Sequence, residues 1–292
     1  MKRTSFLSGL SVALVLGLTS AARAASWPAG WKDPPVASGR ALSAAEREQA
    51  RQLGEAIDSA ETALLAIQAW EQVAAARPDD ADAWVEIGIL RLLEGAAFRS
   101  SAAERLVCYR AALQACERAM ATNPEFLRRV QAGRTTAEAA GALESREMAA
   151  MHSWSTGVFY LFRDCLGLFG RIMNVRLLEG AKTMLERMDE VNPAWEDHVS
   201  TFSWGIYYLA MPVSRGGDRA KARACFDRAV AMGERRLLPR WGRAKYFYVA
   251  VGEPAAARAD LEAVVARDLD GLGGHRAWNR YFQMEAKRLL AR

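Results

Sequence analysis

The fold is decided by the stretch MPVSRGGDRAKARACFDRAVAM, which runs from Met211 to Met232. Pro212 and the pair Gly216-Gly217 turn the chain sharply, because proline fixes one backbone angle and glycine has no side chain. Asp218 follows, and an aspartate in this position caps the first N–H groups of a helix. The sequence therefore predicts structural roles for Gly216, Gly217 and Asp218: a tight corner and the cap of the next helix. An anion bound at that helix start is the weaker alternative, because the Asp218 carboxylate already occupies the position.

The helix predicted after this corner carries a spacing that returns along the chain. A small residue is followed by a larger one four positions later and by a third residue three positions after that, which places all three on one helical face. The sets are Ala66-Trp70-Val73, Ala112-Cys116-Ala119, Ala181-Leu185-Met188, Ala222-Phe226-Ala229 and Ala257-Leu261-Val264. The small residue lets a neighbouring helix approach, and the larger one fills the space beside it. Since we find no convincing strand pattern, the sequence predicts an all-α fold of packed helical hairpins.

A partner helix precedes several of these sets. Trp241 and Tyr248 lie ahead of Ala257 in WGRAKYFYV, and Trp84 begins WVEIGILRLL. This arrangement resembles the tetratricopeptide repeat (TPR), whose first helix has the pattern W-x-x-L-G-x-x-Y and whose second has A-x-x-x-F. The units that begin at Trp84 and Trp154 carry extra residues between their helices. We therefore expect a compact, irregular solenoid of TPR-like hairpins.

The C-terminal segment RAWNRYFQMEAKRLLAR, residues 276–292, is amphipathic. It is expected to form a capping helix that closes the array. Asn279 lies at the edge of its apolar stripe, where it can hydrogen-bond loop carbonyls and fix the helix. The stripe itself consists of Trp278, Phe282, Ala286 and Leu289.

Two segments make the resemblance more specific. SWGIYYLAMP, residues 203–212, leads through Gly-Gly-Asp into Ala-x-x-x-Phe-x-x-Ala, and AVVARDLDGLGGHRAWNRYFQMEAKRLL covers residues 263–290. Together they resemble the TatT family, the tetratricopeptide-like T components of tripartite ATP-independent periplasmic (TRAP) transporters. The resemblance runs from about residue 64 to the end and is strongest over residues 200–292.

The resemblance implies an all-α periplasmic protein that is not an enzyme. It also implies association with the solute-binding protein of a TRAP transporter, assembly as a homotrimer, and an apolar cleft or central pore. The small molecule it implies is a hydrophobic compound or a carboxylate, since such transporters generally import organic acids. Family members are often lipoproteins, whereas this chain has no lipid-bearing cysteine near its predicted cleavage site, so we expect soluble periplasmic residence.

The N-terminus has the pattern of a cleavable secretory signal: basic residues, the apolar stretch 6–18, and Ala22-Arg23-Ala24. We predict a signal peptide over residues 1–24, a Pro/Gly-rich leader over 25–40, and a single TPR-like domain over 41–292. Three basic residues lie in the signal, so the net charge of +5 falls to +2 without it. This charge gives no reason to expect nucleic acid or an anionic membrane as a partner.

The most unusual stretch is HSWSTGVFYLFRDCLGLFGRIM, residues 152–173, which reads as one helix apolar on most of its circumference. Such a helix is buried in the core, lines an apolar cavity or lies in a subunit interface. Arg163 within it can pair with an acidic residue or grip a ligand carboxylate. Aromatic residues on the following helices pack between repeats, and one or two of them can face a cleft. The ligand-cleft candidates are Trp154, Phe159, Phe162, Arg163, Trp204 and Tyr208.

Metal, cofactor and catalytic signatures are missing from the sequence. We find no phosphate-binding loop, dinucleotide fingerprint, zinc-protease motif or nucleophile elbow, and three histidines are scattered. Cys108 and Cys116 lie about 12 Å apart if they share one helix, too far for a disulfide. Buried thiols are therefore the preferred interpretation of Cys108, Cys116, Cys165 and Cys225, with a disulfide as the alternative.

The sequence favours two functions and leaves a third, weaker class, a hydrolase with an unrecognised site. The first is a periplasmic transport accessory that docks on a solute-binding protein and accepts or passes a ligand in an apolar cleft. The second is a TPR-like periplasmic scaffold for envelope or enzyme-complex assembly that holds no small ligand. A cleft lined by residues 154–169 and by one face of residues 204–208 favours the first, and a filled core with a groove of exposed polar residues favours the second.

Overall fold

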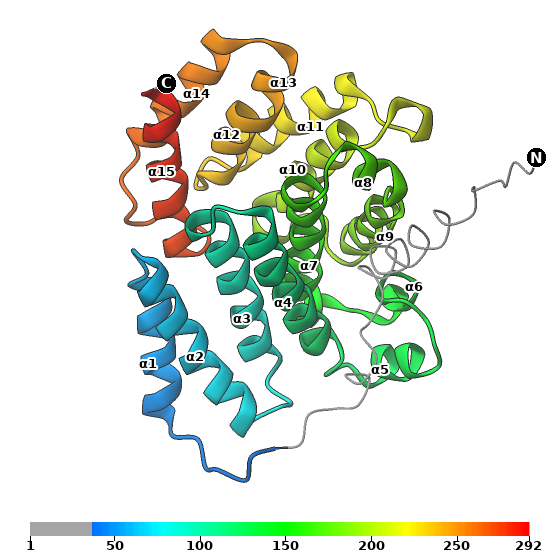
Figure 1. Cartoon of the computed structure of the whole chain (residues 1–292), viewed down its shortest axis with the longest axis vertical. Coiled ribbons are helices and arrows are strands. Elements are labelled where there is room, and N and C mark those ends of the chain that lie inside the picture. Colours follow the sequence, from blue (N-terminus) through cyan, green and yellow to red (C-terminus); the bar gives the residue numbers. More distant parts are fainter. Residues whose placement is uncertain (1–36, 292) are drawn as a thin grey trace, which may run out of the picture.

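The computed structural model describes residues 37–291, and this part of the chain is built from helices without a β-strand (Figure 1). The all-α prediction is confirmed. The predicted signal peptide and most of the predicted leader lie outside the described residues. The α-helices are α1 (Ala44–Glu55), α2 (Ala60–Ala76), α3 (Ala81–Leu93), α4 (Ala102–Met120), α5 (Pro124–Gln131), α6 (Thr136–Ala139), α7 (Met148–Tyr160), α8 (Leu168–Met173), α9 (Arg176–Val191), α10 (Trp195–Ala210), α11 (Arg219–Met232), α12 (Leu238–Gly242), α13 (Val249–Val251), α14 (Pro254–Val265) and α15 (Arg276–Leu290).

Helices that follow one another along the chain pack side by side through α4, after which α4 contacts α7, α7 contacts α9, and α9 and α11 flank α10. The last helix does more than cap the array. α15 packs on α12 and α14 and also touches α1, so the last helix meets the first helix of the described residues (Figure 1). Two long-range bonds hold this closure: Trp278 Nε1 donates to the Ile89 carbonyl at 3.3 Å, and Arg280 Nη1 donates to the Glu55 carbonyl at 2.7 Å. The assignment of the hairpins as TPR-like stays a prediction.

The residues predicted to pack between the helical hairpins lie in the core. Ala112, Ala119, Ala181, Ala222, Phe226, Ala229, Trp241, Tyr248 and Ala257 are all buried. A close helix approach occurs at Gly88 of α3, where an added Cβ would lie 2.7 Å from Cys116 Sγ. A side chain at this position would force α3 and α4 apart, which explains why a glycine stands in the middle of a helix despite its entropic penalty.

The corner after α10 is built as the sequence predicts. Gly216 adopts a left-handed conformation with φ of 99°, and the Gly217 N–H donates to the Pro212 carbonyl at 3.0 Å. The Asp218 carboxylate accepts hydrogen bonds from the N–H groups of Ala220 at 2.9 Å and Lys221 at 3.0 Å. Asp218 is therefore the N-cap of α11. Its carboxylate occupies the N–H groups that an anion would need, which argues against an anion site at this helix start.

Replacing Asp218 by alanine is expected to lower the free energy of unfolding by about 1 kcal/mol, because two helix-start N–H groups lose their acceptor. Asparagine keeps a side-chain oxygen in the same place, so Asp218→Asn should retain most of the stability. Urea unfolding of the two variants beside the wild type measures the difference. Equal losses in the alanine and asparagine variants would show that the cap contributes nothing.

The prediction of one continuous helix over residues 152–173 is wrong. α7 ends at Tyr160, a π-helical segment covers Leu161–Cys165, and the backbone is extended at Leu166 and Gly167 before α8 begins. The break separates two environments. Trp154 is buried in the core, whereas Phe169 on α8 is 65% exposed. The apolar stripe read from the sequence thus turns outward after residue 167.

The four cysteines are free thiols in the structure. Cys108 and Cys116 both lie on α4, as the distance argument assumed, and both are buried. Cys165 and Cys225 are partly exposed.

A candidate ligand cavity between the helices

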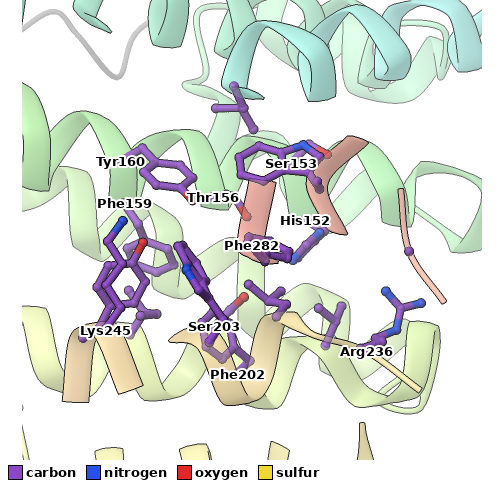
Figure 2. A pocket seen from close by; sticks show the side chains of 18 of the residues that line it. His152, Ser153, Thr156, Phe159, Tyr160, Phe202, Ser203, Arg236, Lys245 and Phe282 are labelled. Carbon is purple, nitrogen blue, oxygen red and sulfur yellow. The ribbon is translucent and has the colours of Figure 1, made fainter. Parts of the chain in front are cut away.

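The return of α15 toward the first helices leaves a cavity of about 810 Å³ inside the bundle. Its walls come from α3, α7, α8, α10, α12, α13 and α15, together with the π-helical segments Leu161–Cys165 and Arg243–Tyr248 and the loops that hold Arg236 and residues 273–275. Figure 2 shows side chains from these separate elements converging on one space. A volume of this size lies within the range of small-molecule sites, which span roughly 300–1,000 Å³.

The centre of the cavity is apolar. Phe202 and Ile206 reach it from α10, Leu92 from α3 and Phe282 from α15. The position of Phe202 is fixed by Gly242 on α12, because an added Cβ there would lie 2.3 Å from the Phe202 ring. An apolar ligand body would therefore find a preformed surface that needs no rearrangement of the helices.

One wall of the cavity is polar. His152, Ser153 and Thr156 lie on consecutive turns of α7, and Ser203 faces them from α10 (Figure 2). Within residues 37–291, the hydroxyls of Ser153, Thr156 and Ser203 form no hydrogen bond, so they are available to a ligand or to water. Burial, followed by the charge of Arg236, lowers the pKa of His152 to about 4, so this imidazole is uncharged at neutral pH. His152 is partly accessible, but the accessible part of its ring faces the cavity. The side chain is therefore largely removed from bulk water.

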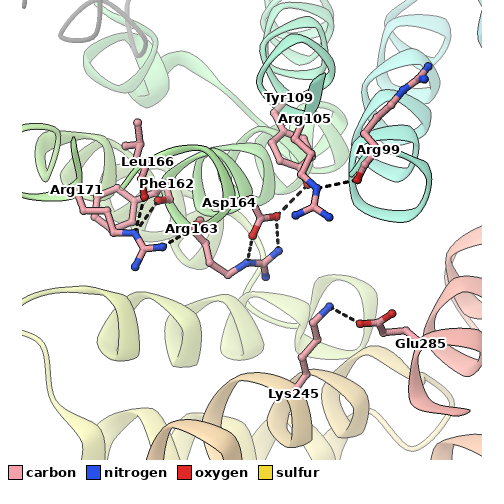
Figure 3. A network of polar contacts seen from close by, with 10 residues as sticks. All are labelled: Arg99, Arg105, Tyr109, Phe162, Arg163, Asp164, Leu166, Arg171, Lys245 and Glu285. Atoms are coloured by element: carbon pink, nitrogen blue, oxygen red, sulfur yellow. Dashed lines mark hydrogen bonds and ion pairs between the residues drawn. The ribbon is translucent and has the colours of Figure 1, made fainter. Parts of the chain in front are cut away.

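Four basic side chains line the cavity against two acidic ones. The basic residues differ in how their charge is balanced. Lys245 Nζ lies 3.2 Å from a Glu285 oxygen, and Arg236 pairs with Glu196 and with Asp197. Arg171 has no acidic partner within the described residues and donates instead to backbone carbonyls (Figure 3). The lining residues that carry charge are Arg163, Arg171, Arg236, Lys245, Glu86 and Glu196.

Arg163 forms the ion pair that the sequence analysis considered for it. Its Nε and Nη2 donate to the two carboxylate oxygens of Asp164 at 2.5 and 2.6 Å, and Asp164 also accepts from the Tyr109 hydroxyl at 3.0 Å (Figure 3). The guanidinium lies over the rings of Tyr160 and Tyr246, at 4.5 and 4.7 Å from their centroids. Burial alone would lower the pKa of Arg163, but Tyr246 and Asp164 outweigh it, and the pKa is raised well above its ordinary value. The side chain is thus a fixed cation in the cavity wall.

The Arg236 end of the cavity contains an unusual backbone segment. Glu196, Asp197 and His198 adopt left-handed conformations with φ of 52°, 56° and 60° at the start of α10. Each such residue is disfavoured by roughly 1–2 kcal/mol relative to the right-handed form. The two ion pairs to Arg236 oppose this strain and hold the segment beside the cavity.

The structure divides the six cleft candidates into two groups. Phe159, Phe162 and Arg163 line the cavity. Trp154, Trp204 and Tyr208 do not line it, and their placement in the cleft is corrected. The cavity face of α7 carries residues 152 and 156, and Trp154 lies two positions from each, about 200° around the helix. The same offset separates Trp204 and Tyr208 from Ile206 on α10.

The three excluded aromatics have other partners. The Trp154 indole donates to Glu117 at 3.0 Å, and the Trp204 indole donates to Asp189 at 2.6 Å. Tyr208 stacks on Trp204 at a centroid distance of 5.8 Å. They are packing residues between α4, α7, α9 and α10.

Several lining residues escaped the sequence analysis. Lys245 lies in the predicted helix WGRAKYFYV and Arg236 in the loop before it, and nothing in one sequence links them to α7. Phe282 and Trp241 are buried packing residues, as their positions in the predicted helices indicate. They also line the cavity, which no pattern in the sequence predicts. Asn279 donates to the Gly273 carbonyl at 3.1 Å, which is the loop contact considered for it, and it also lines the cavity.

Outside the cavity, Glu117 on α4 is a buried carboxyl group. Its Oε1 accepts hydrogen bonds from the Thr136 hydroxyl at 2.7 Å and from the Trp154 indole at 3.0 Å. Burial raises the pKa of Glu117 to about 7, and these two donors only partly oppose the shift. The folded protein therefore binds this proton more tightly than the unfolded chain does.

This shift predicts a component of stability that falls as pH rises. The contribution is complete below the unfolded pKa near 4.5 and is lost by the time the pH exceeds about 7. Its full size is about 3 kcal/mol. Glu117→Gln keeps the acceptor oxygen without the charge, so the variant should gain stability over the wild type across this window. Urea unfolding at several pH values measures it, with exposed Glu61→Gln as the control. Parallel pH profiles for wild type and Glu117→Gln would rule the effect out.

Comparison with known protein families gives a match. A family model described as TRAP transporter T-component matches residues 95–292, about two thirds of the chain. This span contains every cavity-lining residue except the three contributed by α3. No curated protein matches the chain. Within residues 37–291, no helix is long and apolar enough to cross a membrane, and no cluster of three or more His, Cys, Asp or Glu side chains could hold a metal ion.

Proposed function

Since this chain belongs to the family of TRAP transporter T-components, we propose that it is a periplasmic accessory that binds the transporter's solute-binding protein and holds an apolar or organic-acid ligand in its cavity. The T-components are accessory proteins of a transport system and not an enzyme family. The protein would act by binding and hand-off, without covalent chemistry and without a cofactor.

The observation that carries this proposal is the cavity of about 810 Å³ with an apolar centre. A scaffold that works only through its outer surface does not need a half-open cavity of this size between its helices, because apolar side chains that line empty space lose the packing contacts of a filled core. The preformed apolar wall supports a ligand with a hydrophobic body. The basic side chains in the lining, Lys245 among them, support a ligand whose polar end is a carboxylate.

Lys245 is the residue through which the carboxylate preference can be tested. Its acidic partner Glu285 also pairs with Arg288 at 2.7 Å, so removal of the ammonium group leaves Glu285 balanced. Lys245→Met keeps the aliphatic stem. We expect the variant to bind decanoate several-fold to about tenfold more weakly, which is the effect of one partly screened charge, and to bind decanol unchanged. Isothermal titration with both ligands measures this, and an equal loss for decanol would indicate a packing defect instead.

The partner is tested by affinity purification of the tagged chain from a periplasmic extract, with mass spectrometry of co-purifying proteins and of extracted small molecules. Recovery of a solute-binding subunit and of a defined apolar or acidic compound is the expected result. Recovery of assembly factors alone, with an empty cavity, would favour the scaffold alternative. Light scattering on the purified protein tests the homotrimer expected from the family resemblance.

A further inference from the structure

Helix α8 exposes an apolar surface that the cavity does not use. Leu168 is 79% exposed, Phe169 65%, Ile172 64% and Met173 57%, although α8 is only six residues long. Large apolar side chains scattered singly over a surface are common, but four together on one short helix are typical of a contact site. Leucine, phenylalanine, isoleucine and methionine are also the side chains that enter the apolar edge of a lipid bilayer.

Basic side chains lie on α8, directly after it and close to the segment that precedes it. Arg171 lies on the helix and Arg176 follows it, and both are exposed. Arg105 and Arg110 of α4 lie close to Cys165: burial and Asp164 raise the pKa of this thiol to about 11, and these two arginines, with Arg163, oppose the shift.

Asp164, the carboxylate next to Cys165, is already paired with Arg163 and the Tyr109 hydroxyl. The surface therefore combines an apolar helix with a surrounding group of arginines whose charge is not neutralised locally. This clustering is invisible in the net charge of the chain, which gave no reason to expect an anionic membrane.

The helix is held firmly in its exposed position. The Arg171 guanidinium donates to the carbonyls of Leu166 at 3.0 Å, Phe162 at 3.3 Å and Arg163 at 2.5 Å (Figure 3). The Asn174 side chain donates to the Gly170 carbonyl at 2.8 Å. The Arg171 bonds satisfy carbonyls of the preceding segment and tie α8 to it, and the Asn174 side chain adds a donor at the C-terminal end of α8, so the helix keeps its place without a covering partner.

We propose that α8 is a peripheral membrane-docking element that inserts Leu168, Phe169, Ile172 and Met173 into the surface of an anionic lipid bilayer. The surrounding arginines contact lipid phosphates, and their long stems allow the guanidinium groups to stay at the headgroup level. The basic surroundings favour an anionic bilayer over a neutral one. Phe162, Arg163 and Arg171 also line the cavity, so docking would place the bilayer next to the cavity wall. This inference does not depend on the proposed transport function.

The test is co-sedimentation of the purified full chain with vesicles of phosphatidylcholine alone and of phosphatidylcholine mixed with phosphatidylglycerol. We expect binding to the mixed vesicles that weakens as salt is raised. Leu168→Ser/Phe169→Ser/Ile172→Ser/Met173→Ser should lower the partition coefficient by roughly tenfold or more, because the inserted apolar area is lost. Single Phe169→Ser should give a smaller loss. Arg110→Gln/Arg176→Gln should weaken binding and reduce its salt dependence.

The matched control is Leu65→Ser/Val213→Ser/Met284→Ser, which removes exposed apolar side chains from other helices and loops. It should bind vesicles as the wild type does, and both variants share the wild-type N-terminus, so that segment cannot account for a difference. Absence of wild-type binding to anionic vesicles, or equal binding by the α8 variant, would overturn the proposal. So would an α8 variant that converts an oligomer to a monomer in light scattering, because the surface would then be a contact between copies of the chain.

Discussion

Replacing Thr156 by tryptophan is expected to abolish ligand uptake. Thr156 lies on α7 in the polar wall, and its side chain points into the cavity between the Ser203 and Phe282 sides (Figure 2). An indole at this position would occupy the apolar centre that a ligand body needs. We expect the affinity for decanoate to fall by about a hundredfold or more, because a preformed site offers the ligand no other enclosed surface. Isothermal titration measures the affinity directly.

The large substitution should be tolerated by the fold. Overpacking is destabilising when a core is already full, but here the new side chain enters empty space. The free energy of unfolding should therefore change by less than about 1 kcal/mol. Thr156→Val is the matched control, since it removes the hydroxyl and keeps the volume, and it should bind decanoate within a few-fold of the wild type. A tryptophan variant that binds as well as the valine variant would show that the cavity is not the ligand site.

Replacing Gly217 by alanine should give the largest loss of stability of any single methyl addition at the corner. An added Cβ would lie 1.8 Å from the Met211 carbonyl oxygen and 2.7 Å from its carbon. Both atoms belong to the backbone, so no side-chain rotation can relieve the overlap. The overlap could be relieved only by moving the end of α10 away from the start of α11. We expect a loss of about 3 kcal/mol or more in the free energy of unfolding.

The neighbouring glycine provides the control for this prediction. Gly216 has a positive φ, but an added Cβ there meets no atom within 4 Å. Gly216→Ala should therefore lose only the conformational strain of about 1–2 kcal/mol. Urea unfolding of the two variants should place Gly217→Ala well below Gly216→Ala. The reverse order would mean that backbone conformation, not steric overlap, dominates this corner.

Local sequence was sufficient where a structure depends on residues close together in the chain. Asp218 caps α11 because its carboxylate accepts from the N–H groups two and three residues ahead. The sequence alone predicts this contact, because all of its groups lie within four residues. Ala222 and Phe226 are buried because their spacing matches the helix period. The same logic failed over residues 152–173, because an apolar periodicity does not reveal an extended break such as that at Leu166 and Gly167.

The six cleft candidates show why periodicity alone does not identify the residues that line the cavity. Phe159 and Trp154 are both aromatic residues of α7, yet one lines the cavity and the other lies in the core against Glu117. Helical periodicity tells which residues share a face, but α7 is apolar on more than one face. Which face meets a neighbouring helix and which one meets the cavity depends on helices far away in the sequence.

The sequence by itself determined the all-α class, the corner and cap before α11, and the buried faces of the recurring helices, because these follow from chemistry within a few residues. Only the tertiary structure decided that a cavity exists and which charges surround it. A cavity is the difference between the spacing of helices and the volume of the side chains between them, and that spacing is set here by contacts such as Trp278 with Ile89 and Gly242 with Phe202. The exposure of α8 has the same origin, because residues 168–173 do not by themselves determine whether another helix covers them.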